Sequence, residues 1–398
     1  MKILCLSTYP VDQPRHGGQH RLSNIIAVLR NAGHDVYSAG VLGSPSYPPS
    51  RYFVPYPGNE VLGKLIANPS LMEDWAVGAL FQNNRAYFES LAKLIPVKPD
   101  LIYCEQPWMF GFAQQFNKKA CRGKAILIYG SANVESTLKK GIVNYHFGAK
   151  AADECAEMVR IVELNATQNA EQTFCVSEHD MAWTTEHAPT PPILAPNGVI
   201  DRVAGLDDIA KANEITNGAK FALYCASAHP PNIDGFFDIF GFGVGCFPPA
   251  AKMVVAGGAG GHILNDFKFA KLASRRDFYV DAGEVTEQVL RGLLATAHQI
   301  VLPITHGGGT NLKSAEAIWS GCHVVATTKA MRGFEQFSGD DGISVADEPA
   351  AFCKAVRDTF LRPNLALTPA NREKRKVVLW EHCLSDFVQA INEIGART

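Results

Sequence analysis

Short apolar runs alternate with longer stretches of helical spacing along this chain. The run at residues 299–303 is rich in β-branched residues, as is typical of a strand buried on both faces of a parallel sheet. The runs predict strands at residues 2–7, 36–39, 101–105, 125–129, 174–177, 221–227, 252–256, 278–281, 299–303 and 322–327. A strand, a crossover helix and a second strand form a right-handed parallel unit whose ligands bind beyond the carboxyl ends of the strands. The pattern therefore predicts an α/β fold.

Amphipathic spacing predicts the helices that follow these strands. The first helix comes after a loop at residues 10–18, carries Leu22, Ile25, Ile26 and Leu29 on its apolar face, and ends at Gly33. Further helices are expected at residues 149–169, 286–297 and 377–394, with broken helices over 62–94. Residues 44–58 are rich in proline and aromatic residues, so neither a helix nor a regular strand is expected there.

The chain has 398 residues, which is too many for one ordinary core, because domains usually contain about 100–200 residues. The turn Pro196-Asn197-Gly198 precedes a polar linker and is the predicted boundary. We therefore expect an N-terminal domain at residues 1–198, a second α/β domain at 199–376 and a final helical segment at 377–398.

Composition excludes several classes of protein. The formal charge of −2 and the absence of a basic stripe give no electrostatic reason to expect a nucleic acid partner. The ten cysteines include no C-x-x-C pair, and Cys5, Cys104, Cys175 and Cys225 fall inside predicted strands, so we interpret them as reduced core residues. No apolar run approaches the ~20 residues of a membrane span, and the N-terminus lacks a signal-like apolar region. These features favour a cytoplasmic protein without a transmembrane segment, with peripheral membrane contact left open.

Residues 297–334 contain the most informative pattern. The strand at 299–303 is followed by His306-Gly307-Gly308-Gly309 and then by a helix that begins near Leu312 and ends at Gly321. Either Thr310 or Asn311 can cap the start of this helix. Three consecutive glycines at a helix N-terminus expose backbone N–H groups to an anion, and the helix end adds about half a positive charge.

Lys313 and Glu316 lie on one face of that helix, because residues three apart are neighbours. A cation beside a phosphate cradle and a carboxylate that can accept bonds from two ribose hydroxyls together suit a nucleoside diphosphate. The alternative is a tight strand-to-helix turn with an exposed Lys-Glu pair of little energetic value.

Two common phosphate motifs are excluded by spacing. A P-loop requires Gly directly before Lys-Ser, whereas Leu312 precedes Lys313 here. The second glycine cluster, Gly257 to Gly261, has Ile263 where a dinucleotide fingerprint needs its third glycine. Neither cluster predicts a standard ATP or NAD site.

The stretch HGGGTNLKSAEAIWSGCHVVATTKAMRG, residues 306–333, resembles the nucleotide-sugar signature of the retaining GT-B glycosyltransferases of family four. Residues 9–21 resemble the N-terminal glycine loop of that family, residues 195–199 its interdomain Pro-Asn-Gly turn, and residues 231–234 a loop of the same subgroup. Order and spacing agree over most of the chain, and residues 40–100 match weakly.

The resemblance implies the GT-B fold: two Rossmann-like parallel-sheet domains that face each other across a cleft, with a C-terminal helix that crosses back to the first domain. It implies catalytic roles for Lys313 and Glu316 and no metal or other cofactor. The implied donor-binding residues are Gly17, Gly18, His306, Gly307, Gly308, Gly309, Thr310, Asn311 and Leu312. Arg332 is an alternative to His306 as an additional phosphate contact.

This chain departs from the family pattern at two positions. Many relatives have His where Ala132 stands, and most have Glu where Gly308 stands; both residues contact the donor sugar there. Asn133 or Glu135 can substitute for the missing His. Arg21, Glu105, Asn133 and Glu135 are therefore the candidates for sugar or acceptor contacts.

The implied activity is transfer of a sugar, with retention, from a UDP-, GDP- or dTDP-linked donor to an unidentified acceptor. Synthesis of surface glycans, polysaccharides or glycoconjugates is the expected context. Two alternatives remain at this point: a noncatalytic nucleotide-sugar binding protein, and a GT-B sugar-nucleotide epimerase. The small number of carboxylates in the matched loops disfavours the epimerase.

Overall fold

The structure is a computed structural model that describes residues 1–66, 69–241, 245–271, 275–306 and 310–397. The chain divides into two compact units. Unit 1 contains Met1–Pro196 and Cys383–Thr398, and unit 2 contains Asn197–His382. Each unit is built around its own parallel sheet, which places one row of strand ends and loops at the carboxyl edge of each unit.

Unit 1 is built on a seven-stranded sheet in the order β3-β2-β1-β4-β5-β6-β7, in which neighbouring strands are parallel. Its strands are β1 Lys2–Ser7, β2 Asp35–Val41, β3 Phe53–Val54, β4 Leu101–Glu105, β5 Ile126–Ser131, β6 Gln172–Cys175 and β7 Ile193–Leu194. Its helices are α1 Gly17–Asn31, α2 Asn59–Leu62, α3 Pro69–Asn83, α4 Arg85–Leu94, α5 Phe110–Ala120, α6 Glu135–Phe147, α7 Ala149–Asn169, α8 Glu178–Thr185 and α18 Ser385–Ala396.

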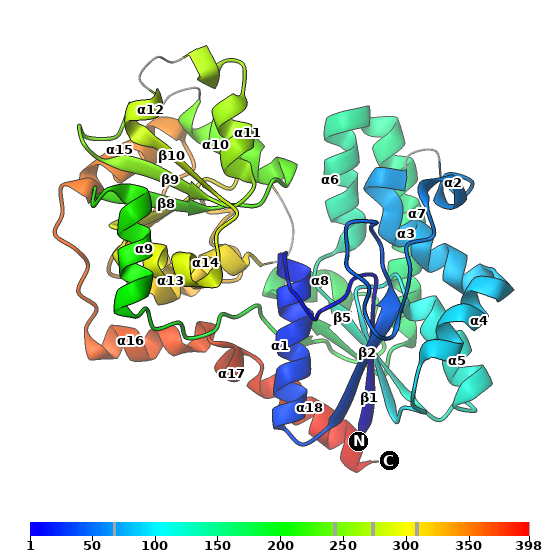
Figure 1. Cartoon of the computed structure of the whole chain (residues 1–398). Coiled ribbons are helices and arrows are strands. Elements are labelled where there is room, and N and C mark those ends of the chain that lie inside the picture. The colour runs from blue at the N-terminus through cyan, green and yellow to red at the C-terminus, as the bar shows by residue number, and fades with distance from the viewer. Residues whose placement is uncertain (67–68, 242–244, 272–274, 307–309, 398) are drawn as a thin grey trace. The chain divides into compact units, whose positions relative to one another are not determined.

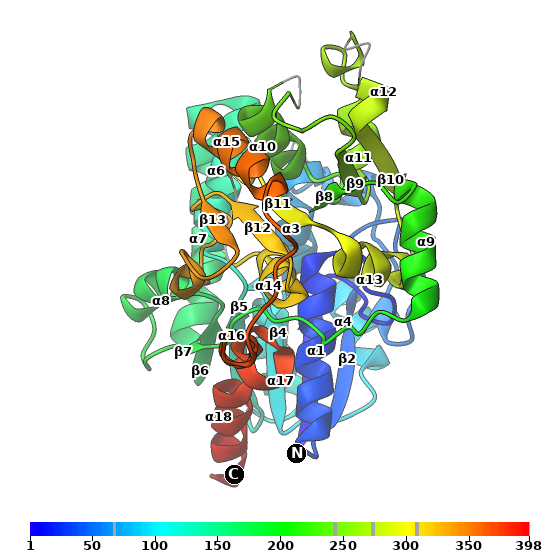
Figure 2. The same cartoon turned by 90° about the vertical axis from the view of Figure 1, so that its left-hand side faces the viewer.

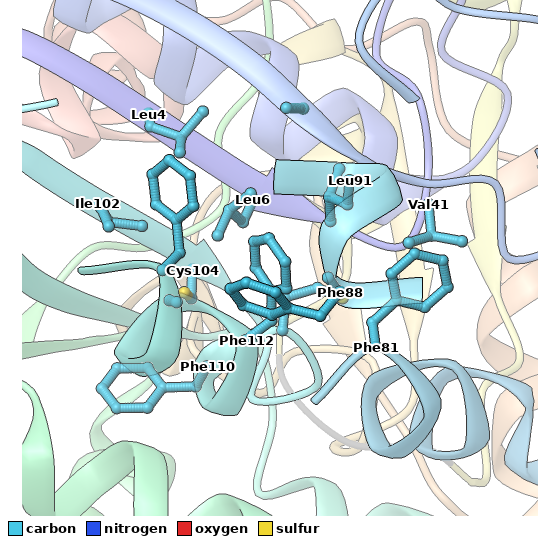
Figure 3. Packing of buried hydrophobic residues seen from close by; sticks show 14 of the residues in the cluster. Leu4, Leu6, Val41, Phe81, Phe88, Leu91, Ile102, Cys104, Phe110 and Phe112 are labelled. Carbon is cyan, nitrogen blue, oxygen red and sulfur yellow. The ribbon is translucent and has the colours of Figure 1, made fainter. Parts of the chain in front are cut away.

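Helices cover both faces of this sheet. Alternate residues of β1 and β2 point to one face, where they pack with apolar residues of α3, α4 and α5. Figure 3 shows this cluster, in which Leu6 of β1 lies near Phe88 and Phe112. The helix α1 covers the opposite face of the sheet (Figure 1). Burial on both faces explains why the strands read as continuous apolar runs.

The helix α18 completes unit 1 although it is the last element of the chain. The ring of Phe387 is fully buried and packs against Phe174 and Tyr103, with ring centroids 4.7 and 5.8 Å apart. The Cys383 thiol also donates a hydrogen bond to the Pro196 carbonyl, at 3.6 Å. The core of unit 1 is therefore assembled from the two ends of the chain.

Unit 2 is built on a six-stranded sheet in the order β10-β9-β8-β11-β12-β13. Its strands are β8 Phe221–Cys225, β9 Lys252–Ala256, β10 Tyr279–Gly283, β11 Gln299–Leu302, β12 His323–Ala326 and β13 Ile343–Val345. Its helices are α9 Leu206–Thr216, α10 Pro230–Phe240, α11 Ala259–Asn265, α12 Arg275–Phe278, α13 Glu287–Thr296, α14 Leu312–Ser320, α15 Pro349–Phe360 and α16 Pro369–Arg375. The short helix α17, Trp380–Cys383, contains the point at which the chain returns to unit 1.

Two layers of helices enclose the sheet of unit 2. The helices α9, α13 and α14 pack on one face, and α10, α11 and α15 pack on the other (Figures 1 and 2). The alternation along β8 shows the division, because Leu223 belongs to the first layer and Tyr224 to the second. The predicted α/β class with two parallel sheets is confirmed.

Two sequence predictions differ from the structure. Residues 44–58 contain the two-residue strand β3, which pairs with the end of β2 and so needs only a short extended segment. The helix predicted at 377–394 is interrupted: Leu379 is extended, with ψ of 140°, and the neighbouring backbone bonds to Val199. The apolar spacing was read correctly, but this strand-like bridge breaks the helix.

Candidate functional site

The strand order of unit 2 reverses beside β8. From β8 the chain proceeds to β9 and β10 on one side, and then returns to β11, β12 and β13 on the other. The loops that leave the carboxyl ends of β8 and β11 therefore run in opposite directions. The place where the strand order reverses is called a switch point, and open α/β sheets bind their ligands there. These two loops lead into α10 and α14.

The helix α10 packs closely against the loop that follows β11. A Cβ atom on Gly235 would lie 2.3 Å from the Pro303 carbonyl oxygen, so this approach requires glycine. Three residues earlier, Asn232 is held in place because its side-chain amide donates to the Ser227 carbonyl at 2.9 Å. The Tyr224 hydroxyl donates to the Asn232 carbonyl, also at 2.9 Å.

Lys313 joins the two loops of the switch point. Its Nζ donates a hydrogen bond of 2.6 Å to Oδ1 of Asn232, across from α14 to α10. Loss of hydration lowers the pKa of Lys313 to about 8, with Cys225 and Glu316 acting in the opposite direction. The ammonium group is thus a fixed, poorly hydrated cation, which favours interaction with an anionic ligand.

The glycines Gly307, Gly308 and Gly309 lie outside the described residues, but both flanks of the loop are held. On one side, Thr305 donates from its hydroxyl to Asp238 of α10 at 2.6 Å, and the exposed His306 ring lies 3.3 Å from the same carboxylate. On the other side, Asn197 donates to the Thr310 hydroxyl at 2.8 Å. The predicted roles of the three glycines, His306 and Thr310 remain predictions.

Asn311, one of the two predicted caps, is the residue that caps the start of α14. The Asn311 side chain accepts a hydrogen bond from the backbone N–H of Lys313, whereas Thr310 lies outside the helix. Leu312 is the first helical residue, and Gly321 ends the helix with a positive φ of 79°. This cap directs the half-buried Lys313 side chain toward α10.

Glu316 is paired with a cation that the sequence did not indicate. Its Oε1 accepts a hydrogen bond from Nη1 of Arg202 at 2.5 Å. Arg202 lies between β7 and β8 in the sequence, 114 positions before Glu316, so only the fold brings these two residues together.

Unit 1 has its own switch point, beside β1. The sheet extends to β2 and β3 on one side of β1 and to β4 and later strands on the other. Gly17 and Gly18 begin α1, after the loop that follows β1, and the helix start has no side-chain cap. A Cβ atom on Gly18 would lie 2.9 Å from the Tyr9 hydroxyl, which has no hydrogen-bond partner within the described part of the chain. The two glycines therefore open a helix end next to a buried polar group.

Arg21 and Glu105 form an internal ion pair. The Nε–Oε1 distance is 3.1 Å, and the side chains are only 1% and 0% exposed. Arg21 also donates to the Ala195 carbonyl at 2.9 Å. The structure thus uses both charges inside unit 1, where they connect α1, β4 and the segment after β7.

Asn133 and Glu135 lie together at the end of β5. Oε1 of Glu135 accepts hydrogen bonds from Asn133 at 3.1 Å and from Gln106, which follows β4, at 3.2 Å. Burial raises the pKa of Glu135 to about 7, and Lys139 and Asn133 oppose this shift. The carboxylate of Glu163, which lies on α7, caps the N-terminus of α6: it accepts a hydrogen bond from the backbone N–H of Glu135 at 2.6 Å.

We expect Glu135→Gln to stabilise the protein at pH 8 and to change little at pH 5. The carboxyl group holds a proton below pH 7 in the folded protein but only below about 4.5 when unfolded, so stability declines as pH rises between these values. The pKa difference corresponds to about 3 kcal/mol at most. Thermal unfolding at both pH values measures this effect. The exposed Glu154→Gln is the control, and equal shifts at pH 5 and pH 8 would contradict the prediction.

The structure therefore brings together Lys313, Glu316, Asn311 and Leu312 in unit 2. In unit 1 it brings together Arg21 with Glu105 and Asn133 with Glu135. Sequence reasoning missed Asn232 and Arg202 as partners of the two predicted catalytic residues. Asn232 had a signal, since it lies in the Pro-Asn-Ile-Asp loop at residues 231–234, but Arg202 had none.

Among the described residues, no group of three or more His, Cys, Asp or Glu side chains could hold a metal ion. None of the helices in that part of the chain is long and apolar enough to cross a membrane.

Comparisons with known proteins identify the fold. No protein-family model matches the chain, and no curated protein matches it. Among solved structures, sucrose-phosphate synthase from Thermosynechococcus elongatus is similar with a TM-score of 0.69, 15% identity and full coverage of both chains. HepE from Anabaena, in complex with UDP and glucose, gives 0.61 and 14%, covering 100% of this chain and 98% of that one.

The catalytic domain of starch synthase IV from Arabidopsis thaliana, bound to ADP and acarbose, is also similar. Its TM-score is 0.63 at 12% identity, with 99% of this chain and 98% of that chain covered. Likeness at such low identity shows the fold alone. The GT-B fold implied by the sequence is therefore confirmed: the chain shares the two-unit α/β architecture of these three structures.

Proposed function

We propose that the protein is a glycosyltransferase that uses a nucleoside-diphosphate sugar. The observation that carries this proposal is the position of Lys313, a poorly hydrated cation at the start of α14 and at the switch point of unit 2. A diphosphate bound there would meet both the ammonium group and the helix N-terminus. Solved structures with the same fold contain UDP, UDP-glucose or ADP.

The proposed chemistry is departure of the nucleoside diphosphate from the anomeric carbon. Negative charge grows on the leaving phosphate, and a fixed cation with oriented N–H groups stabilises that charge without reorganisation. We expect retention of configuration, no metal requirement and action in the cytoplasm, in the synthesis of a glycan or glycoconjugate. The acceptor is an unidentified molecule with a hydroxyl group.

Slow hydrolysis of donors tests this proposal without knowledge of the acceptor. The purified protein is incubated with UDP-, GDP-, ADP- and dTDP-sugars, and the products are separated by chromatography. A glycosyltransferase releases free sugar and nucleoside diphosphate from its donor, because water slowly replaces the acceptor. An isomeric nucleotide sugar would instead indicate an epimerase, and thermal stabilisation without any product would indicate a binding protein.

A further inference from the structure

The segment that enters unit 2 is attached to one face of α14. The indole Nε1 of Trp319 donates to Oδ1 of Asp201 at 2.9 Å, and the next residue, Arg202, donates to Glu316 at 2.5 Å. Trp319 and Glu316 are three residues apart and therefore lie on the same face of the helix. Asp201 and Arg202 thus both bind the face of α14 that carries Glu316, the predicted ribose-binding carboxylate.

Arg202 bridges two carboxylates from different helices. Its Nη1 bonds to Glu316 of α14, and its Nε bonds to Oε1 of Glu287 of α13, both at 2.5 Å. The side chains of Arg202 and Glu316 are only 16% and 19% exposed. Limited contact with water strengthens this interaction relative to a surface ion pair and restricts the guanidinium to one geometry.

The pairing leaves half of the Glu316 carboxylate available. Arg202 occupies Oε1, while Oε2 accepts no hydrogen bond from any residue that the structure describes. An ionised carboxylate has about four lone-pair sites, so Oε2 can accept from adjacent hydroxyl groups. The positive charge of Arg202 also offsets the repulsion between Glu316 and a nearby diphosphate.

We propose that Arg202 is a positioning residue that orients Glu316 to receive the ribose hydroxyls of the donor, and that the donor is therefore a ribonucleotide rather than a 2′-deoxyribonucleotide. This inference rests on the proposed function. It extends that function by assigning a role to a residue before β8 and by narrowing the nucleotide class.

Nucleotide binding by calorimetry tests the inference directly. For each base that binds, the dissociation constant of the ribonucleoside diphosphate is compared with that of its 2′-deoxy counterpart, using UDP, GDP and ADP. The wild-type protein should prefer the ribonucleotide by about tenfold, which is the effect of one hydrogen bond to a charged group. Arg202→Ala and Glu316→Ala should both remove most of this preference.

Arg202→Lys should restore part of the preference, because a lysine carries the charge but cannot bridge two carboxylates with a planar group. In turnover with the identified donor, Arg202→Ala should raise KM and change kcat little. The control is Arg291→Ala. Arg291 lies on α13, and its guanidinium pairs with Asp208 at 3.0 Å and not with Glu316. This control should retain the wild-type preference.

The outcomes separate the two proposals. Wild-type protein that binds no nucleoside diphosphate would overturn the proposed function, and this inference with it. Nucleotide binding with no ribose preference, or an undiminished preference in folded Arg202→Ala protein, would overturn the inference while leaving the proposed function in place.

Discussion

Lys313→Ala is expected to reduce turnover of the donor by about 10²–10³-fold, the usual loss when one preorganised charge-stabilising group is removed. The Nζ atom is held 2.6 Å from Asn232, so it is in place before the leaving phosphate develops its charge. Donor hydrolysis under saturating conditions measures kcat. The effect should appear mainly in kcat, because the stabilised charge is largest in the transition state.

Lys354→Ala is the matched control. Lys354 lies on α15, is 77% exposed and pairs with Asp358 on the same helix, so its loss should leave turnover unchanged. Lys313→Arg keeps a cation and should retain part of the activity. Wild-type turnover in Lys313→Ala would exclude the proposed role of this residue.

Because the pKa of Lys313 is lowered, we also expect nucleotide affinity of the wild-type protein to depend on pH. Below about pH 8 the side chain is charged in the free protein, and above it the side chain is neutral. Affinity for a nucleoside diphosphate should therefore fall as pH rises through about 8. Lys313→Arg should lack this dependence, because guanidinium stays protonated throughout that range.

Arg21→Ala is expected to destabilise unit 1 by about 3–5 kcal/mol, the usual cost of leaving one charge of a buried pair without its partner. Glu105 is fully buried, and Arg21 supplies its cation as well as hydrogen bonds to the chain after β7. Thermal unfolding gives the overall loss. Hydrogen exchange of the β1 and β4 amides shows whether the loss is located in unit 1.

Two further variants check the cause of this destabilisation. Arg85→Ala breaks a surface pair whose side chains are 91% and 42% exposed, and it should leave the stability nearly unchanged. The double variant Arg21→Met with Glu105→Gln removes both charges and should recover part of the lost stability. A single Arg21→Ala variant as stable as the Arg85→Ala variant would contradict the prediction.

The sequence predicted the fold well because strands buried on both faces need long apolar runs. The strand at 252–256 and the helix at 149–169 were predicted with the observed bounds. The start and end of α14 were also predictable, because Asn311 and Gly321 are residues with specific roles at helix ends.

The partners of the candidate site could not be predicted, because they depend on strand order. Lys313 and Asn232 are 81 positions apart, and Glu316 and Arg202 are 114 positions apart. The same holds for Arg21 and Glu105, which are 84 positions apart and pair inside unit 1. Their predicted sugar or acceptor contacts remain predictions.

The position of α18 affects how the protein is made. Pro196 ends the first segment of unit 1, and Cys383 follows 187 positions later. At about 5–20 residues per second, the ribosome needs roughly 10–40 s to synthesise the chain between them. During that interval the surfaces of Tyr103 and Phe174 that Phe387 later covers face water. Unit 1 is therefore the first to be synthesised but becomes complete only after the whole of unit 2 has been synthesised.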